Sequence, residues 1–445
     1  MLNKERIYEI IDFVIKEAEG YNTQVLVFSN EMGLTRFAKS EIHQNVFEDK
    51  TEVIITILEG KKQSQIATTL YDKEGLRAAV KEAINNLKFL PEGEVELSLV
   101  SSPKLIEDED FNKELDTVFN IEGRARLIKQ GINLLEPGYK TYGALSYGIM
   151  NVAYGNSIGI KRFMKGNNVE FNVLVSNEKG GTGYAQLISN RPGDLDIIGA
   201  FKIAYEKAKM NRNPMRIKPG PYTVILEPLA VGDLLTYMAY IGFSGKSVQD
   251  HRSFLTGKKG EKIFDERITI VDDFTDENTL TLPFDTEGYP RQKVTIIENG
   301  IVKDLVYDQA SAIKDGVKST GHSINMFEIG GMPLNLVMLA GDQSLEEIIK
   351  STENGLLITR FHYMNVVNPR QAILTALTRD GVFKIENGKI VGAVENMRFT
   401  ESMFEAFNNV IAISRERQRT KAFIGNYYVP ALKIKNFHFT GNTNV

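Results

Sequence analysis

The chain has 445 residues, of which 42% are hydrophobic and 25% are charged. This composition is typical of a folded, water-soluble protein with two or three domains. Lys and Arg number 53, Asp and Glu number 57, and the net charge is -4. That balance argues against nucleic acid as a partner, because binding phosphates requires clustered cations. Cysteine is absent, which excludes disulfides, thiol nucleophiles and zinc sites built on thiolates.

In the first half, apolar periodicity and turn residues predict helices that alternate with runs of strands. In chain order, these elements are a helix at Lys4–Glu19, a strand at Gln24–Phe28, a hairpin of Val53–Leu58 and Ser64–Thr69, a helix capped by Asp72 and ending near Phe89, a helix at Glu122–Leu135, strands near 143–153, 158–164, 169–176 and 182–188, and a helix at Asp194–Met210. Gly166-Asn-Asn168 is interpreted as a turn between two of these strands, and the acidic stretch Glu107–Asp116 has no clear pattern.

A proline-rich segment, Asn211–Pro221, holds three prolines and cannot continue a helix. We therefore place a domain boundary there. Residues 1–210 are predicted to form an N-terminal α+β domain, residues 211–221 a linker, and residues 222–445 a C-terminal β-rich domain.

The second half is predicted to consist mainly of strands. It begins with a strand at Tyr222–Leu226 and a helix at about 229–241, and later helices are expected near 344–351 and 402–415. Both later helices start with a capping-box pattern, Ser344 with Glu347 and Ser402 with Glu405. Ile297–Val302 and Ile385–Ile390 each place Asn-Gly between β-forming runs, which predicts two tight hairpins. The fold class is therefore α+β, with mixed or antiparallel sheets and flanking helices.

No membrane-spanning or secretory segment is expected. The N-terminal stretch carries charges throughout, unlike the apolar centre of a secretory signal. The most apolar long window, Tyr222–Phe243, contains Glu227, Pro228 and Asp233, which is too polar for the middle of a bilayer helix. We expect a cytoplasmic protein.

Common catalytic motifs are missing from the sequence. Gly242–Ser247 ends like a phosphate-binding loop, but Tyr240 stands where the first glycine is required, so we interpret the segment as a glycine-rich connection. Neither a Gly-x-Ser-x-Gly elbow nor a His-Glu-x-x-His helix is present. The five histidines are widely separated, and His322 and His362 are the two that occur in polar segments.

Several segments together resemble the TldD/PmbA family, in particular its TldE (PmbA) branch, whose members have been called modulators of DNA gyrase. The segments that carry the resemblance occur in family order; they are Leu34–Glu41, Glu59-Gly60, Asn156–Gly159, Lys218–Leu226, Pro283–Gly288, Ile297–Gly300, Lys318–His322 and Pro430–Asn436.

The resemblance implies a metallopeptidase-family protein without the metallopeptidase site. TldD-type members carry His-Glu-x-x-x-His on the helix after the Tyr222–Leu226 strand, where two histidines hold zinc and the glutamate activates water. Thr236, Tyr237 and Ile241 stand at these positions, and none can bind zinc or act as the base. We therefore expect no metal and no other cofactor.

The family also implies a role and partners. We expect a subunit that is catalytically inactive alone, pairs with a TldD-like chain or with itself, and serves in peptide binding and assembly within a peptidase system acting on unfolded or extended peptides. One alternative is a self-sufficient hydrolase using His322, His362, Asp380 and Glu401. Another is a DNA-gyrase modulator, against which the net charge argues.

Peptide binding by main-chain pairing is expected in the second domain, because strand addition provides affinity that does not depend on the peptide's side chains. Side chains of the Thr320–Asn325 and Arg360–Asn368 segments would place the peptide. The candidates, chosen because Asn and His can both donate and accept hydrogen bonds and Arg can donate several, are His322, Asn325, Arg360, His362, Asn365 and Asn368.

Overall fold

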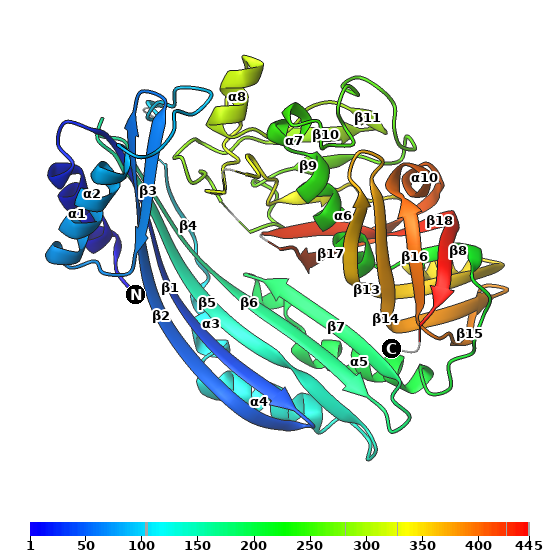
Figure 1. Cartoon of the computed structure of the whole chain (residues 1–445). Helices are drawn as coiled ribbons and strands as arrows, with labels where there is room; N and C mark the ends of the chain where they lie inside the picture. The colour runs from blue at the N-terminus through cyan, green and yellow to red at the C-terminus, as the bar shows by residue number, and fades with distance from the viewer. Residues whose placement is uncertain (103–105, 281, 327, 424, 444–445) are drawn as a thin grey trace.

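The computed structural model describes residues 1–102, 106–280, 282–326, 328–423 and 425–443. Within them the chain forms two β-sheets with helices packed against each (Figure 1). The α+β fold class predicted from the sequence is confirmed.

The first sheet is seven-stranded, and its order is β3-β2-β1-β5-β6-β4, with β7 also paired to β6. Neighbouring strands are antiparallel except β4 and β6, which are parallel. Its strands are β1 (Asn22–Ala38), β2 (Glu41–Glu59), β3 (Lys62–Thr68), β4 (Ile106–Asp110), β5 (Lys140–Asn156), β6 (Lys161–Ser176) and β7 (Thr182–Ser189).

Helices cover one face of this sheet, and the opposite face is turned toward the second half of the chain. Side chains alternate along a strand, so Val25 and Val27 pack among residues of α1 and α2, whereas Leu26 packs with Phe284 of the second half. The helices are α1 (Lys4–Glu17), α2 (Lys73–Asn86), α3 (Lys113–Val118), α4 (Ile121–Ile132) and α5 (Ile197–Met210). Figure 1 shows α1 and α2 near one end of the long strands and α4 near the other.

The second sheet is 11-stranded, and part of it closes on itself. Its order is β11-β10-β9-β12-β18-β16-β14-β13-β8, with β15 on β14 and β17 on β18. Because β8 pairs with both β13 and β18, the strands β8, β13, β14, β16 and β18 form a closed ring. The strands are β8 (Gly220–Leu226), β9 (Ile270–Asp272), β10 (Val294–Glu298), β11 (Ile301–Val302), β12 (Leu336–Met338), β13 (Asn354–Asn368), β14 (Ile373–Glu386), β15 (Lys389–Ala393), β16 (Met397–Ser402), β17 (Val410–Lys421) and β18 (Asn426–Asn442).

The largest core lies where α6 packs on this sheet. Val224 of β8, Leu235 of α6 and Leu432 of β18 are all fully buried in it. Burial of such side chains contributes roughly 1.5–3 kcal/mol each. The helices of this half are α6 (Pro228–Gly242), α7 (Gly245–Gln249), α8 (Gln309–Asp315), α9 (Leu345–Lys350) and α10 (Met403–Asn408).

Most elements predicted from the sequence are confirmed. Asp72 caps α2 by accepting from the amides of Glu74 and Gly75, and Ser344 with Glu347 forms a complete capping box on α9. Both Asn-Gly hairpins form, β10–β11 and β14–β15, with positive φ at each Asn and Gly.

Three predicted features are wrong. The turn at Gly166-Asn-Asn168 does not exist: β6 runs through it, because these residues pair with β5 and the Asn167 side chain bonds to the main chain of Asn112. The helix predicted at 402–415 ends at Asn408, since the following residues pair with β18 as β17. Ser402 makes no side-chain cap bond on α10. The acidic stretch Glu107–Asp116, for which the sequence showed no clear pattern, overlaps β4 and α3.

The proline-rich segment connects α5 to β8, and the division of the chain into domains there stays a prediction. Residues 444–445 of the predicted second domain lie outside the described residues. No helix in the described part of the chain is both long and apolar enough to cross a membrane.

Candidate functional site

The candidate site starts at α6, the helix that follows strand β8. Pro228 begins it, where a missing N–H costs nothing. Its apolar residues pack on the second sheet, which fixes the positions of Thr236, Tyr237 and Ile241. Thr236 and Ile241 are buried and Tyr237 is partly buried.

These three side chains do not fit a zinc ion. The hydroxyl of Thr236 donates to the carbonyl of Gly232 at 2.8 Å, and that of Tyr237 donates to the carbonyl of Met364 at 2.6 Å. Ile241 has no ligand atom. Elsewhere in the described ranges, no cluster of three or more His, Asp or Glu residues could hold a metal. We derive no metal chemistry for this chain.

Strand β13 runs beside α6 and has an edge that is only partly paired. It pairs with β8 over Leu356–Ile358, and past Ile358 no strand of the described residues pairs with that edge. Two of its main-chain groups bond to α6: the amide of Phe361 donates to Asp233 at 3.0 Å, and the carbonyl of Met364 accepts from Tyr237. The remainder of β13, to Asn368, is a place where an extended chain could add as a strand.

A groove of about 590 Å³ lies next to this edge. Tyr240 and Ile241 of α6 form one side, and Asn325 and Val366 come from the two segments predicted to place a peptide. Tyr240 and Met326 are each about half exposed, at 47% and 50%. The fold therefore brings the two predicted segments together beside Ile241, one of the positions where the family resemblance places the zinc motif.

Four of the predicted peptide-binding side chains lie in or near this region. Asn325 accepts from Gln65 of β3 at 2.6 Å, and Asn365 is exposed. His362 is partly buried, and its ring centre lies 4.2 Å from that of Tyr363 with the two rings tilted by 55°. Asn368 accepts from the amide of Arg370, which ends the strand in a turn. Their role in peptide binding stays a prediction.

Arg360 and His322 are engaged inside the protein. Arg360 donates from Nε to Asp380 at 2.7 Å, and its guanidinium lies 4.1 Å from the ring centre of Tyr184 on β7. His322 is fully buried. Arg360 therefore ties the second sheet to the first, and His322 does not face the groove.

His322 belongs to a buried charged cluster with Asp272 and Arg291. Burial, with Arg291 acting in the same direction, lowers the pKa of His322. Its Nε2 lies 3.0 Å from Asp272, and its Nδ1 lies 2.9 Å from both the carbonyl and the hydroxyl of Thr320. Burial acts to raise the pKa of Asp272, but His322, Arg291 and the amide of Asn335 hold it below its ordinary value.

Two neighbouring carboxyls, Asp285 buried and Glu287 partly buried, lie in the family-like segment Pro283–Gly288. Burial raises the pKa of Asp285 to about 6, although the amides of Ser323 and Tyr289 bond to it. Burial and the neighbouring Asp285 raise the pKa of Glu287 well above its ordinary value. The segment Pro283–Gly288 supports the family resemblance, but its sequence alone does not show that Asp285 and Glu287 lie close together.

The residues of the alternative hydrolase hypothesis have separate partners. Asp380 accepts from Thr182 and Arg360, whereas Glu401 accepts from the amides of Ser402 and His438. With His322 bonded to Asp272 and Thr320, these contacts do not assemble the set into one catalytic constellation.

Comparison with known proteins adds the following. Residues 219–441 match the family model described as the PmbA/TldA metallopeptidase C-terminal domain. A metalloprotease TldD homologue of Buchnera aphidicola is 31% identical over 259 residues, which cover 54% of this chain and 52% of that protein. The chain thus spans about half the length of the curated relatives it matches.

Solved structures match over nearly the whole chain. TldE from Thermococcus kodakarensis is 23% identical, with a TM-score of 0.88 over 98% of this chain and 100% of that one. A proposed modulator of a DNA gyrase from Thermotoga maritima is 20% identical, with a TM-score of 0.84 over 98% and 100% of the two chains. At these identities the likeness establishes the fold.

Proposed function

The chain belongs to the PmbA/TldD metallopeptidase family, and from that premise we propose that it is a non-catalytic subunit that holds extended peptides for a family peptidase. The observation that carries the proposal is the set of side chains on α6. Thr236, Tyr237 and Ile241 stand where the family resemblance places the motif's ligands and base, and the groove and the partly paired edge of β13 lie beside them. The whole protein's substrates and partners are part of this proposal.

The replaced positions now have structural roles. Tyr237 spans from α6 to β13 through its bond to Met364, and Thr236 bonds within its own helix. A hydroxyl that bonds to a main-chain carbonyl stabilises by about 0.5–1.5 kcal/mol. Helix α6 thus supports the strand along which a peptide would pair.

The partly paired edge of β13 supports the peptide-holding role. An added strand gains main-chain hydrogen bonds whatever its sequence, while the side chains at alternate positions contact pockets. Tyr363, Asn365 and Val367 are exposed on β13, which has register shifts between His362 and Asn365 and between Val366 and Asn368. A peptide paired there would run beside the groove between α6 and the Asn325 segment.

Peptide binding can be tested with a labelled extended peptide and its N-methylated forms. Strand addition uses every second peptide amide, so N-methylation at one set of alternate residues should abolish binding, measured by fluorescence anisotropy. N-methylation at the other set should leave affinity within about twofold, since those amides point away from the protein. Equal loss from both sets, or from neither, would contradict strand pairing.

Protein variants localise the binding. Substituting His362 and Asn365 by alanine should weaken peptide affinity by about 1–3 kcal/mol for each essential hydrogen bond removed. The matched control is His43→Ala on the exposed part of β2, which should leave affinity unchanged. Unchanged affinity in the His362/Asn365 variant of normal stability would place the peptide elsewhere.

Metal analysis tests the loss of catalysis. The purified chain should hold no stoichiometric zinc and cleave no peptide alone, because neither imidazole nor carboxylate stands at the motif positions. About one tightly held zinc per chain, or cleavage by the chain alone, would refute the non-catalytic assignment and favour a self-sufficient hydrolase.

A further inference from the structure

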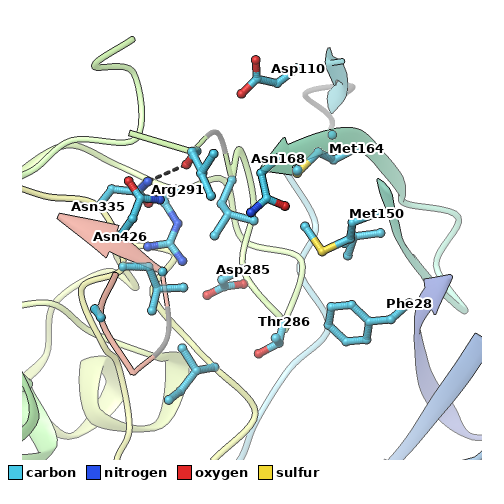
Figure 2. A pocket seen from close by; sticks show the side chains of 18 of the residues that line it. Phe28, Asp110, Met150, Met164, Asn168, Asp285, Thr286, Arg291, Asn335 and Asn426 are labelled. Carbon is cyan, nitrogen blue, oxygen red and sulfur yellow. Dashed lines mark hydrogen bonds between the residues drawn. The ribbon is translucent and has the colours of Figure 1, made fainter. Parts of the chain in front are cut away.

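A pocket of about 420 Å³ lies between the two sheets and is separate from the groove beside β13. Its floor is apolar and comes from the uncovered face of the first sheet, where Phe28, Met150 and Met164 line it. The first half also contributes Asp110, Asn168 and Glu170. The opposite wall comes from the second half and mixes apolar side chains, such as Phe284 and Leu334, with polar ones. Figure 2 shows Asp285, Arg291, Asn335 and Asn426 on that wall, opposite Phe28 and Met150.

The opposite wall holds groups whose hydrogen-bonding capacity is unused. The Arg291 side chain is 1% exposed, and its Nε and Nη1 have no hydrogen-bond partner within the described part of the chain. The closest carboxylate approach is Nη1 to Asp272 at 3.8 Å, which is too long for a hydrogen bond.

Two asparagines add to this unused capacity. Asn426 is fully buried, and neither its Nδ2 nor its Oδ1 has a partner among the described residues. Asn335 is 1% exposed; its Nδ2 donates to the carbonyl of Leu280, but its Oδ1 accepts no bond from any described residue. An unsatisfied buried polar group costs about 1–3 kcal/mol, so three such residues at one pocket indicate a ligand that completes them.

The unused groups define what such a ligand must offer. Arg291 and Nδ2 of Asn426 need acceptors, whereas the amide oxygens of Asn335 and Asn426 need donors. A carboxylate has no proton to donate and would add a negative charge beside Asp272 and Asp285. An ammonium has no acceptor and would lie close to Arg291. An amide group offers both a carbonyl and an N–H without a charge.

We propose that the inter-sheet pocket binds an uncharged ligand in which an apolar group is joined to amides, the chemistry of an apolar residue within a peptide chain. The apolar group lies against Phe28, Met150 and Met164, and the amides bond to Arg291, Asn335 and Asn426. A volume of about 420 Å³ is within the range of small-ligand pockets.

The pocket adjoins helix α6. Phe423 lines the pocket, and its ring centre lies 5.2 Å from that of Tyr237 on α6. The inference goes beyond the strand pairing at β13, because it assigns selectivity for an apolar side chain to a different surface. It does not require that the β13 edge bind peptide.

N-acetyl-leucinamide is the probe that tests the pocket. With isotope-labelled methionine methyl groups, titration should shift the Met150 and Met164 resonances saturably. Met403, fully buried in the core of the second half, should not shift. N-acetyl-leucine, which is an anion, and leucinamide, which is a cation, should bind at least about tenfold more weakly. Absence of a saturable shift at Met150, or equal affinity for the charged analogues, would overturn the proposal.

Two variants approach the pocket from opposite walls. Asn426→Leu should weaken probe binding at least about tenfold by removing two hydrogen-bonding groups. Met150→Trp should block binding by filling the apolar floor, with the Met164 resonance as the remaining reporter. If Asn426→Leu does not fold, Met150→Trp alone decides. Probe affinity unchanged by Met150→Trp in a folded variant would refute the site.

The outcome can be separated from that of the proposed function. If the probe fails to bind and the extended peptide still pairs in the N-methylation experiment, the pocket assignment falls and the β13 role stands. If the probe binds at Met150 and no peptide pairs with β13, the pocket assignment stands alone.

Discussion

At the residue scale, Asp233 connects helix α6 to strand β13, and its pKa is higher than that of an ordinary aspartate. Its Oδ2 accepts from the amide of Phe361 at 3.0 Å. Burial raises the pKa of Asp233 to about 7, although the Phe361 amide and Arg360 act in the opposite direction. A carboxyl whose pKa is higher in the folded state contributes stability below its unfolded pKa of about 4. That contribution is lost as pH rises through about 7.

Asp233→Asn should therefore flatten the pH dependence of stability. Asparagine keeps an oxygen for the Phe361 amide and carries no charge, so the variant should be up to about 4 kcal/mol more stable than the wild type at pH 8. The two should be nearly equal at about pH 3.5, below the unfolded pKa. Calorimetric melting between these pH values checks this, with the exposed Asp342→Asn as control. Parallel pH profiles for wild type and Asp233→Asn would contradict the expectation.

Only part of the candidate site could be predicted at this scale. That Thr236, Tyr237 and Ile241 offer neither imidazole nor carboxylate is visible in the sequence, once the family resemblance has placed the zinc motif at these positions. The unused groups of Arg291 and Asn426 are not visible, because whether a polar side chain is satisfied depends on neighbours distant in the chain. His322 was expected in a polar segment but is buried against Asp272. Its burial also depends on neighbours that are distant in the chain.

At the scale of elements, the two Asn-Gly hairpins were predictable because the requirement for positive φ is local. In the β10–β11 hairpin Gly300 has a φ of 76°, and an added Cβ would lie 2.1 Å from the carbonyl oxygen of Phe264. Gly316, which ends α8 with a φ of 67°, has open space around it. The same substitution should therefore have different costs at these two glycines.

Gly316→Ala should destabilise by about 1 kcal/mol, the cost of a left-handed backbone without glycine. Gly300→Ala should cost at least about 2 kcal/mol more, because the methyl group also collides with main chain. Melting temperatures of the two variants against wild type provide the comparison. Equal costs would mean that the Phe264 segment moves aside easily.

The elements that were mispredicted depend on partners far away in the chain. Gly166-Asn-Asn168 has turn-forming residues, but β5 pairs with all three residues and β4 pairs with Gly166. Residues 410–415 continue a helical pattern, yet β18 provides a strand partner that outweighs local preference. Local signals were correct where no distant strand competed, as at the Asp72 cap and the two Asn-Gly hairpins.

At the scale of the whole molecule, we predict that the chain is a dimer, with itself or with a relative that carries His-Glu-x-x-x-His. The family's expected two-subunit organisation motivates this, and a non-catalytic subunit requires a catalytic partner to act. Sedimentation velocity at micromolar concentration should show a species of twice the chain mass, alone or after the relative is added. A monomer under both conditions would contradict the prediction.

The closed ring of strands has a consequence for how the protein is made. β8 is the first of its strands to be synthesised and β18 the last, and β18 pairs with β8, β12, β16 and β17. At about 5–20 residues per second, a ribosome takes on the order of 10–40 s to travel from one to the other. During that time β8 lacks its partner β18. The apolar side chains of α6 therefore have no complete sheet to pack against. A translational pause just before β18 should therefore lengthen the exposure of nascent chains to chaperones and to aggregation.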